Sequence, residues 1–92
     1  MIYIVTYDLS CKDDKQDYQP LINLIKEEGI WAFLGGSSYL VESNLSASQL
    51  RDKYAHVLKA ADKLFVSVVT APAAWHGYSK EVSDWIIRKF ER

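Results

Sequence analysis

A run of β-branched and aromatic residues at positions 2–7 constrains the fold of this chain more than any other feature of its sequence. Val, Ile, Thr and Tyr favour extended strands, and alternate positions of the run are apolar on both sides. A strand that is apolar on both faces belongs in the middle of a sheet. The run stops at Asp8. We therefore expect a buried central strand that carries a single carboxylate at its end.

The chain has 92 residues, which is enough for one hydrophobic core but not for two. We predict a single domain over residues 1–92, with its core in residues 1–69 and a C-terminal loop and helix in residues 70–92. Because 49% of the residues are hydrophobic and 13% are aromatic, we expect a globular protein with some apolar surface left for a partner to cover.

The charge and the cysteine content restrict the partners and the compartment. A net charge of −1 provides no overall attraction to a phosphate backbone, so a nucleic-acid site would need a local basic patch or a bound cation. The single cysteine, Cys11, excludes an internal disulfide bond. The sequence shows no signal peptide with a charged start followed by an apolar stretch. It also shows no apolar run of about 18 residues, the length of a membrane span. We expect a soluble, cytoplasmic protein without a membrane partner.

Turn residues and hydrophobic periodicity predict the next elements. Polar residues 10–16 form a loop. A helix follows, with Asp17 as its N-cap and Gly29 as its C-terminal stop. Two short strands are expected at residues 30–34 and 39–43. The hairpin that joins them consists of Gly35, Gly36, Ser37 and Ser38.

The second helix has the best-marked start in the chain. Ser46, followed three residues later by Gln49, predicts a capping box, and apolar residues at helical spacing continue to Ala61. An apolar run at residues 64–69 predicts a fourth strand. Ser79 can then cap a last helix. The apolar face of that helix consists of Val82, Trp85, Ile86 and Phe90.

The order strand-helix-strand-strand-helix-strand, with short connections, predicts a ferredoxin-like α+β fold to which the C-terminal amphipathic helix is added. Four antiparallel strands would have the first and third in the centre and two helices on one face. The opposite face would carry aromatic residues that need a cover, drawn from Tyr3, Tyr7, Trp31, Phe33, Tyr39 and Phe65. Three alternatives could cover this face: the terminal helix, a second subunit, or unstacked bases of RNA.

Asp8 allows two interpretations. It can accept hydrogen bonds from the backbone N–H groups of Leu9, Ser10 and Cys11, as aspartates at turns commonly do. It can also bind a hard cation such as Mg²⁺, which takes oxygen ligands and often only one or two carboxylates. Since each chain offers one aspartate here, a metal site would require a dimer that brings two together.

Three features of residues 1–69 occur together: a first strand closed by Ile4-Val5-Thr6-Tyr7-Asp8-Leu9, a helix ending in Gly29, and a hairpin with Gly36-Ser37-Ser38-Tyr39. In these features the chain resembles the small ferredoxin-like nucleases of the CRISPR-associated protein two family and the virulence-associated protein D toxins. Those families share an aliphatic strand ending in Tyr-Asp or Phe-Asp and, later, a Ser followed by a small or apolar residue and an aromatic one.

The resemblance implies a homodimer in which the two strand-end aspartates face each other, with a divalent metal between them, and the cleavage of phosphodiester bonds in RNA or DNA. Asp8 matches the metal-binding aspartate and Ser37 matches the hairpin serine. Tyr7 and Tyr39 lie beside them, at a nucleic-acid-binding site.

The chain departs from the pattern of those families at two places. They usually carry arginines after the aspartate, whereas this loop reads Lys12-Asp13-Asp14-Lys15 and is nearly neutral. Their tail is typically a strand exchanged with the partner, whereas this tail predicts a helix.

Three functions follow from these observations. The first is a Mg²⁺-dependent endonuclease with Asp8 and Ser37 as catalytic residues, and with Lys12, Lys15 and Arg51 as contacts to the nucleic-acid backbone. The second is a non-enzymatic dimeric module with a structural or regulatory role, which the acidic balance and the missing arginines favour. The third is a platform for single-stranded RNA. That platform would require exposed rings at Tyr3, Tyr7 and Phe65.

The segment before the last helix carries two further candidates. His76 can act as a general acid or base near neutral pH, or it can be a surface residue without a role. Trp75, Trp85 and the apolar residues 71–74 resemble a hydrophobic latch, which would be either part of the core or an interaction surface.

Overall fold

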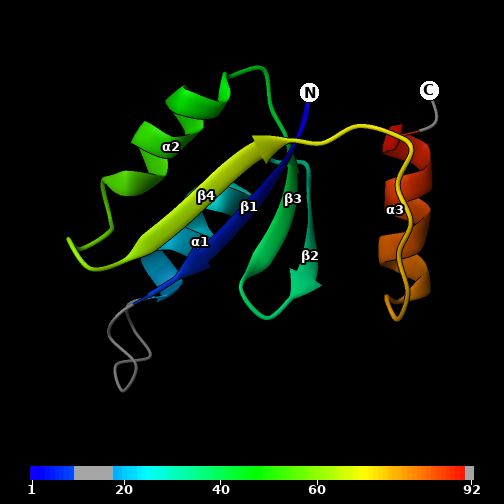
Figure 1. Cartoon of the computed structure of the whole chain (residues 1–92), viewed down its shortest axis with the longest axis horizontal. Coiled ribbons are helices and arrows are strands. Elements are labelled where there is room, and N and C mark those ends of the chain that lie inside the picture. Colours follow the sequence, from blue (N-terminus) through cyan, green and yellow to red (C-terminus); the bar gives the residue numbers. More distant parts are fainter. Residues whose placement is uncertain (10–17, 91–92) are drawn as a thin grey trace.

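The computed structural model describes residues 1–9 and 18–90 (Figure 1). The four strands form one antiparallel sheet in the order β2-β3-β1-β4. This is an α+β fold, and the first and third strands occupy the centre as predicted. In chain order the elements are β1 (Ile2–Asp8), α1 (Tyr18–Lys26), β2 (Trp31–Gly35), β3 (Ser38–Glu42), α2 (Ala47–Ala55), β4 (Lys63–Val68) and α3 (Lys80–Phe90).

The central strand β1 fixes the two faces of the sheet. Thr6 lies opposite Ser38 of β3 on one side and opposite Phe65 of β4 on the other. Since residues opposite each other in an antiparallel pair point to the same face, every second position of β1 shares the face of Thr6. We call this the α3 face, because α3 packs on it, and we call the other the α1/α2 face.

The larger core lies on the α1/α2 face. The hydroxyl group of Tyr3 donates a hydrogen bond of 2.7 Å to the carbonyl oxygen of Leu45, which satisfies a buried phenol at the rim of the sheet. The buried residues of this core are Tyr3, Val5, Tyr7, Leu9, Leu21, Ile25, Tyr39, Val41, Leu50 and Tyr54.

The placement of the aromatic residues differs from the expectation. Of the six that were candidates for the face opposite the two helices, only Phe65 lies there. Tyr3, Tyr7 and Tyr39 are buried beneath α1 and α2, and the register puts Trp31 and Phe33 on that same side, because their partners are Val41 and Tyr39. A strand that is apolar on both faces does not say which face two helices will cover, and here they cover the side with the bulkier rings.

The C-terminal helix covers part of the α3 face. Ile86 forms a second buried cluster with Ile2, Ala32 and Leu40, and the apolar face predicted for the helix packs around it. Lys89 adds an ion pair of 2.7 Å to Glu42 of β3. In Figure 1, α3 lies beside β2, on the side of the sheet away from β4. The terminal helix is thus one cover of this face, but the β1–β4 side remains open.

Several local signals in the sequence act as predicted. The capping box forms, with the Ser46 side chain accepting from the Gln49 N–H group and the Gln49 side chain accepting from the Ser46 N–H group. Gly29, Gly35 and Gly36 have φ angles of 86°, 101° and 56°, which a residue with a Cβ atom rarely adopts. The predicted N-cap Asp17 lies outside the described residues.

The second helix is shorter than predicted. It ends at Ala55 and not near Ala61. The N–H group of Val57 donates to the carbonyl of Tyr54, three residues back, so the helix tightens and stops. The Asp62 carboxylate then accepts from the Lys59 N–H group at 2.8 Å, and this turn leads into β4. This side-chain hydrogen bond takes the Lys59 N–H group that a continued helix would use and stabilises the turn.

No helix within residues 1–9 and 18–90 is long and apolar enough to cross a membrane.

The packing of α3 predicts how two neighbouring isoleucines differ. Ile86 is 4% exposed and Ile87 is 43% exposed. Replacing Ile86 with alanine should lower the free energy of unfolding by about 2–4 kcal/mol, because the buried side chain leaves a cavity. Ile87→Ala, the matched control, should change it by less than about 0.5 kcal/mol. Urea denaturation of both variants measures the difference, and equal effects would show that α3 is not anchored through Ile86.

Candidate functional site

Asp8 is the last residue of β1 and is exposed on the α3 face. Its partner across the strand pair is Lys63, the first residue of β4. Within residues 1–9 and 18–90, the Asp8 carboxylate accepts no hydrogen bond and forms no ion pair. It borders a shallow depression of about 190 Å³, lined by Thr6, Tyr7, Asp8, Lys63, Leu64 and Phe65. An exposed carboxylate without a partner is available to a cation or to another molecule.

The serines of the β2–β3 hairpin lie at the same end of the sheet. The N–H group of Tyr7 donates a hydrogen bond of 3.1 Å to the carbonyl oxygen of Ser37. The Ser38 hydroxyl donates to the Thr6 hydroxyl at 3.2 Å. The turn at Ser37 therefore adjoins Tyr7, the residue before Asp8, so Asp8 and Ser37 lie at the same end of the sheet.

Several neighbours of Asp8 were not found from the sequence. Thr6 and Ser38 share its face, and Lys63 and Phe65 flank it on β4. The two-residue alternation of β1 could have indicated Thr6. Lys63 is separated from Asp8 by 55 positions of the chain, and its placement follows only from the register of the sheet.

The two tyrosines predicted at the site have their rings in the core. Tyr7 and Tyr39 are buried on the α1/α2 face, away from Asp8. The Tyr39 ring packs against Phe33, with the ring centroids 4.9 Å apart, and burial raises the pKa of its hydroxyl group. Exposed rings at Tyr3 and Tyr7, which the RNA platform required, are not present, whereas Phe65 is 62% exposed.

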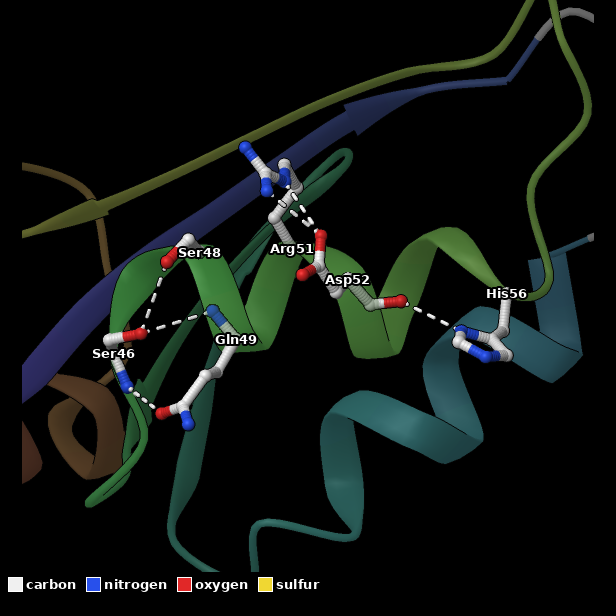
Figure 2. A network of polar contacts seen from close by, with 6 residues as sticks. All are labelled: Ser46, Ser48, Gln49, Arg51, Asp52 and His56. Carbon is white, nitrogen blue, oxygen red and sulfur yellow. Dashed lines mark hydrogen bonds and ion pairs between the residues drawn. The ribbon is translucent and has the colours of Figure 1, made fainter.

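The basic side chains of α2 are bound by neighbouring acids. The Arg51 guanidinium is 2.9 Å from the Asp52 carboxylate (Figure 2). Lys53 forms an ion pair of 2.8 Å with Glu28, just after α1, and this hydrogen bond raises the pKa of Lys53. The remaining contacts in Figure 2 are the capping box, a hydrogen bond of 3.3 Å between the Ser46 and Ser48 hydroxyl groups, and a contact of 2.8 Å between Nδ1 of His56 and the Asp52 carbonyl oxygen. This cluster stabilises the helix itself.

The other predicted basic contacts, Lys12 and Lys15, lie outside the described residues. On the part of the chain that the structure describes, Lys63 is the cation nearest in register to Asp8, and no ion pair engages it there. The Lys63 ammonium group is therefore available to bind an anion such as a phosphate.

The atoms at this end of the sheet that could bind a metal ion are hard oxygen atoms. They comprise the Asp8 carboxylate and the hydroxyl groups of Thr6 and Ser38. Such atoms suit Mg²⁺ or another hard cation. Among residues 1–9 and 18–90, no three His, Cys, Asp or Glu side chains gather closely enough to hold a metal ion.

Neither the models of known protein families nor the curated proteins gave a match to this chain.

The exposure of Asp8 predicts that its charge contributes little to folding. Asp8→Asn should change the free energy of unfolding by less than about 0.5 kcal/mol, because no described partner loses an interaction. Thermal and urea denaturation measure this change. A loss of more than about 1 kcal/mol would instead identify Asp8 as an acceptor for the N–H groups of the following turn.

Proposed function

We propose that the domain is ferredoxin-like, with α3 as an addition to the fold. The order of strands and helices through β4 is the one that defines this motif. The sheet order β2-β3-β1-β4 supports it as well, since two crossovers through α1 and α2 place the first and third strands side by side. Both helices pack on one face.

We propose further that the protein is a metal-dependent endonuclease that acts as a homodimer, like the families that residues 1–69 resemble. The observation that carries this proposal is the exposed carboxylate of Asp8, without a described partner, at the end of the central strand and next to the hairpin serines. A divalent cation bound there would neutralise phosphate charge and lower the pKa of a bound water molecule.

The residues around Asp8 have distinct roles in this proposal. Asp8 holds the cation. The Ser37 turn and the hydroxyl groups of Thr6 and Ser38 orient the scissile phosphate and its water, because they line the same end of the sheet. Lys63 binds a phosphate oxygen next to the scissile bond. Lys12 and Lys15 contact the nucleic-acid backbone.

The dimer is proposed to form through the open β1–β4 side of the α3 face. Phe65 is 62% exposed there, and it lies across from Thr6, two positions before Asp8 on the same face of β1. A second copy that buries Phe65 would bring its own Asp8 to the same interface. This arrangement provides the second carboxylate that a single chain does not offer.

One observation favours a non-enzymatic dimeric module instead. Lys63 lies directly opposite Asp8, and opposite charges at facing positions of a strand pair stabilise a sheet. In that case the lysine, and not a metal ion, would balance the carboxylate.

Cleavage assays test the nuclease. Labelled single-stranded RNA and duplex DNA are incubated with the protein, with and without Mg²⁺ or Mn²⁺. We expect cleavage that requires the metal, and we expect Asp8→Asn to lower the rate by more than about 100-fold, because loss of a metal ligand should exceed the effect of losing an outer-shell partner. Asp84→Asn, on the exposed side of α3 where Asp84 pairs with Lys80, is the matched control and should retain the rate.

Two outcomes would contradict the nuclease. If wild type and Asp8→Asn are equally inactive on all substrates and metals, Asp8 belongs to a non-enzymatic module. If both cleave at the same rate, the activity has another origin. Circular dichroism establishes that the variants are folded.

Light scattering tests the proposed dimer. Phe65→Glu should convert the dimer to a monomer, because it places a charge in an apolar interface. The control is Ile87→Glu, which alters another exposed apolar residue, on the outer side of α3, and should remain dimeric. If Phe65→Glu is still a dimer, the interface lies elsewhere. If it is monomeric and retains full metal-dependent cleavage, the two Asp8 residues do not act together.

A further inference from the structure

A cavity of about 340 Å³ separates the α3 face of the sheet from the segment that leads to α3. This segment, residues 69–79, joins β4 to α3, and we call it the strap. In Figure 1 the strap leaves the end of β4 and then passes alongside α3. The cavity is lined by Ile4, Leu34, Leu40, Val69, Thr70, Pro72, Ala73, Ala74, Trp75, Tyr78, Ile86 and Phe90.

The lining is apolar and uncharged. Strand residues such as Ile4 and Leu40 form its floor, and Ile86 and Phe90 of α3 form one wall. Among the described residues that line it, none carries a charge, and the side-chain polar groups are the hydroxyls of Thr70 and Tyr78 and the indole N–H of Trp75, which is bonded to Ser83. A charged ligand would lose its hydration there without gaining a partner. The cavity therefore selects uncharged molecules.

The strap is tied to α3. The indole N–H group of Trp75 donates a hydrogen bond of 3.1 Å to the Ser83 hydroxyl. The helix is in turn fixed to the sheet by buried Ile86 and by the ion pair between Lys89 and Glu42. These contacts hold Trp75 at the wall of the cavity. Trp75 is 36% exposed, and the lining residues Thr70, Pro72, Ala73 and Ala74 of the strap are exposed as well, so the cavity lies at the surface of the molecule.

The volume and the aromatic wall indicate the shape of the ligand. An apolar cavity of roughly 150 Å³ accommodates one benzene ring, and this cavity is about twice as large. Trp75, Tyr78 and Phe90 offer rings for stacked or edge-to-face contact. We propose that the cavity between the strap, α3 and the sheet binds a small, uncharged aromatic molecule of about two fused rings. This site is separate from Asp8 and does not depend on the nuclease.

Methyl NMR of the wild-type protein with indole tests the proposal. We expect saturable shifts of the Ile4, Leu40 and Ile86 methyl signals, whereas the exposed Ile87 methyl group, on the same helix, should not move. Indole-3-carboxylate has the same ring system with a negative charge, and it should bind at least about tenfold more weakly, because no cation lines the cavity.

Variants that fill the cavity provide the second test. Ala73→Phe and Ala74→Phe enlarge two residues of its wall, and we expect at least one of them to weaken indole binding by about tenfold or more. Ala61→Phe, at an exposed alanine in the turn before β4, is the matched control and should bind indole like the wild type.

Several results would overturn the proposal. They are the absence of saturable methyl shifts, equal binding of indole and its carboxylate, and wild-type affinity in both filled variants. Shifts centred on the methyl groups of Thr6 and Leu64, which line the depression beside Phe65, or on Ile87 would show that indole binds an exposed surface and not the cavity. If the filled variants do not fold, the comparison of the two ligands on the wild-type protein decides.

Discussion

The burial of β1 on both of its faces is the constraint on which the rest of the structure depends. Val5 is fully buried on the α1/α2 face, and Ile2 is buried on the α3 face. Each side of the strand also needs a neighbour for its backbone groups, and β3 and β4 supply them. Two apolar layers must then cover one strand. The helices α1 and α2 form the first layer, and α3 forms part of the second.

Local signals explain how much of this fold was predictable. The capping box at Ser46, the stop at Gly29 and the alternation of β1 each involve residues close in sequence, and each acts as expected. The choice of the face that α1 and α2 cover was not predictable in this way, because the strand is apolar on both sides. The early end of α2 is marked by a tightened turn at Val57 and by the hydrogen bond of Asp62, which a helical periodicity does not reveal.

The residues of the candidate site likewise fall into those that local sequence signals predict and those that only the folded structure brings close. Asp8 and Ser37 were found because a strand end and a glycine-containing turn are visible in the sequence, and the hydrogen bond between Tyr7 and Ser37 places both residues at the same end of the sheet. Lys63 was missed because it meets Asp8 only through the register of β1 and β4. Arg51, predicted as a nucleic-acid contact, is exposed and forms an ion pair with its neighbour Asp52, and a sequence does not show which of two adjacent charges will pair.

The register between β1 and β4 also has a consequence for how the chain assembles during synthesis. Tyr3 lies opposite Val68, so β1 is made well before the strand that completes its pairing. Until β4 has emerged, one edge of β1 has unpaired backbone groups and its apolar side chains lack part of their cover. Pairing between such distant segments is slow to form. The strand that organises the folded protein is therefore also exposed to misassociation while the chain is being made.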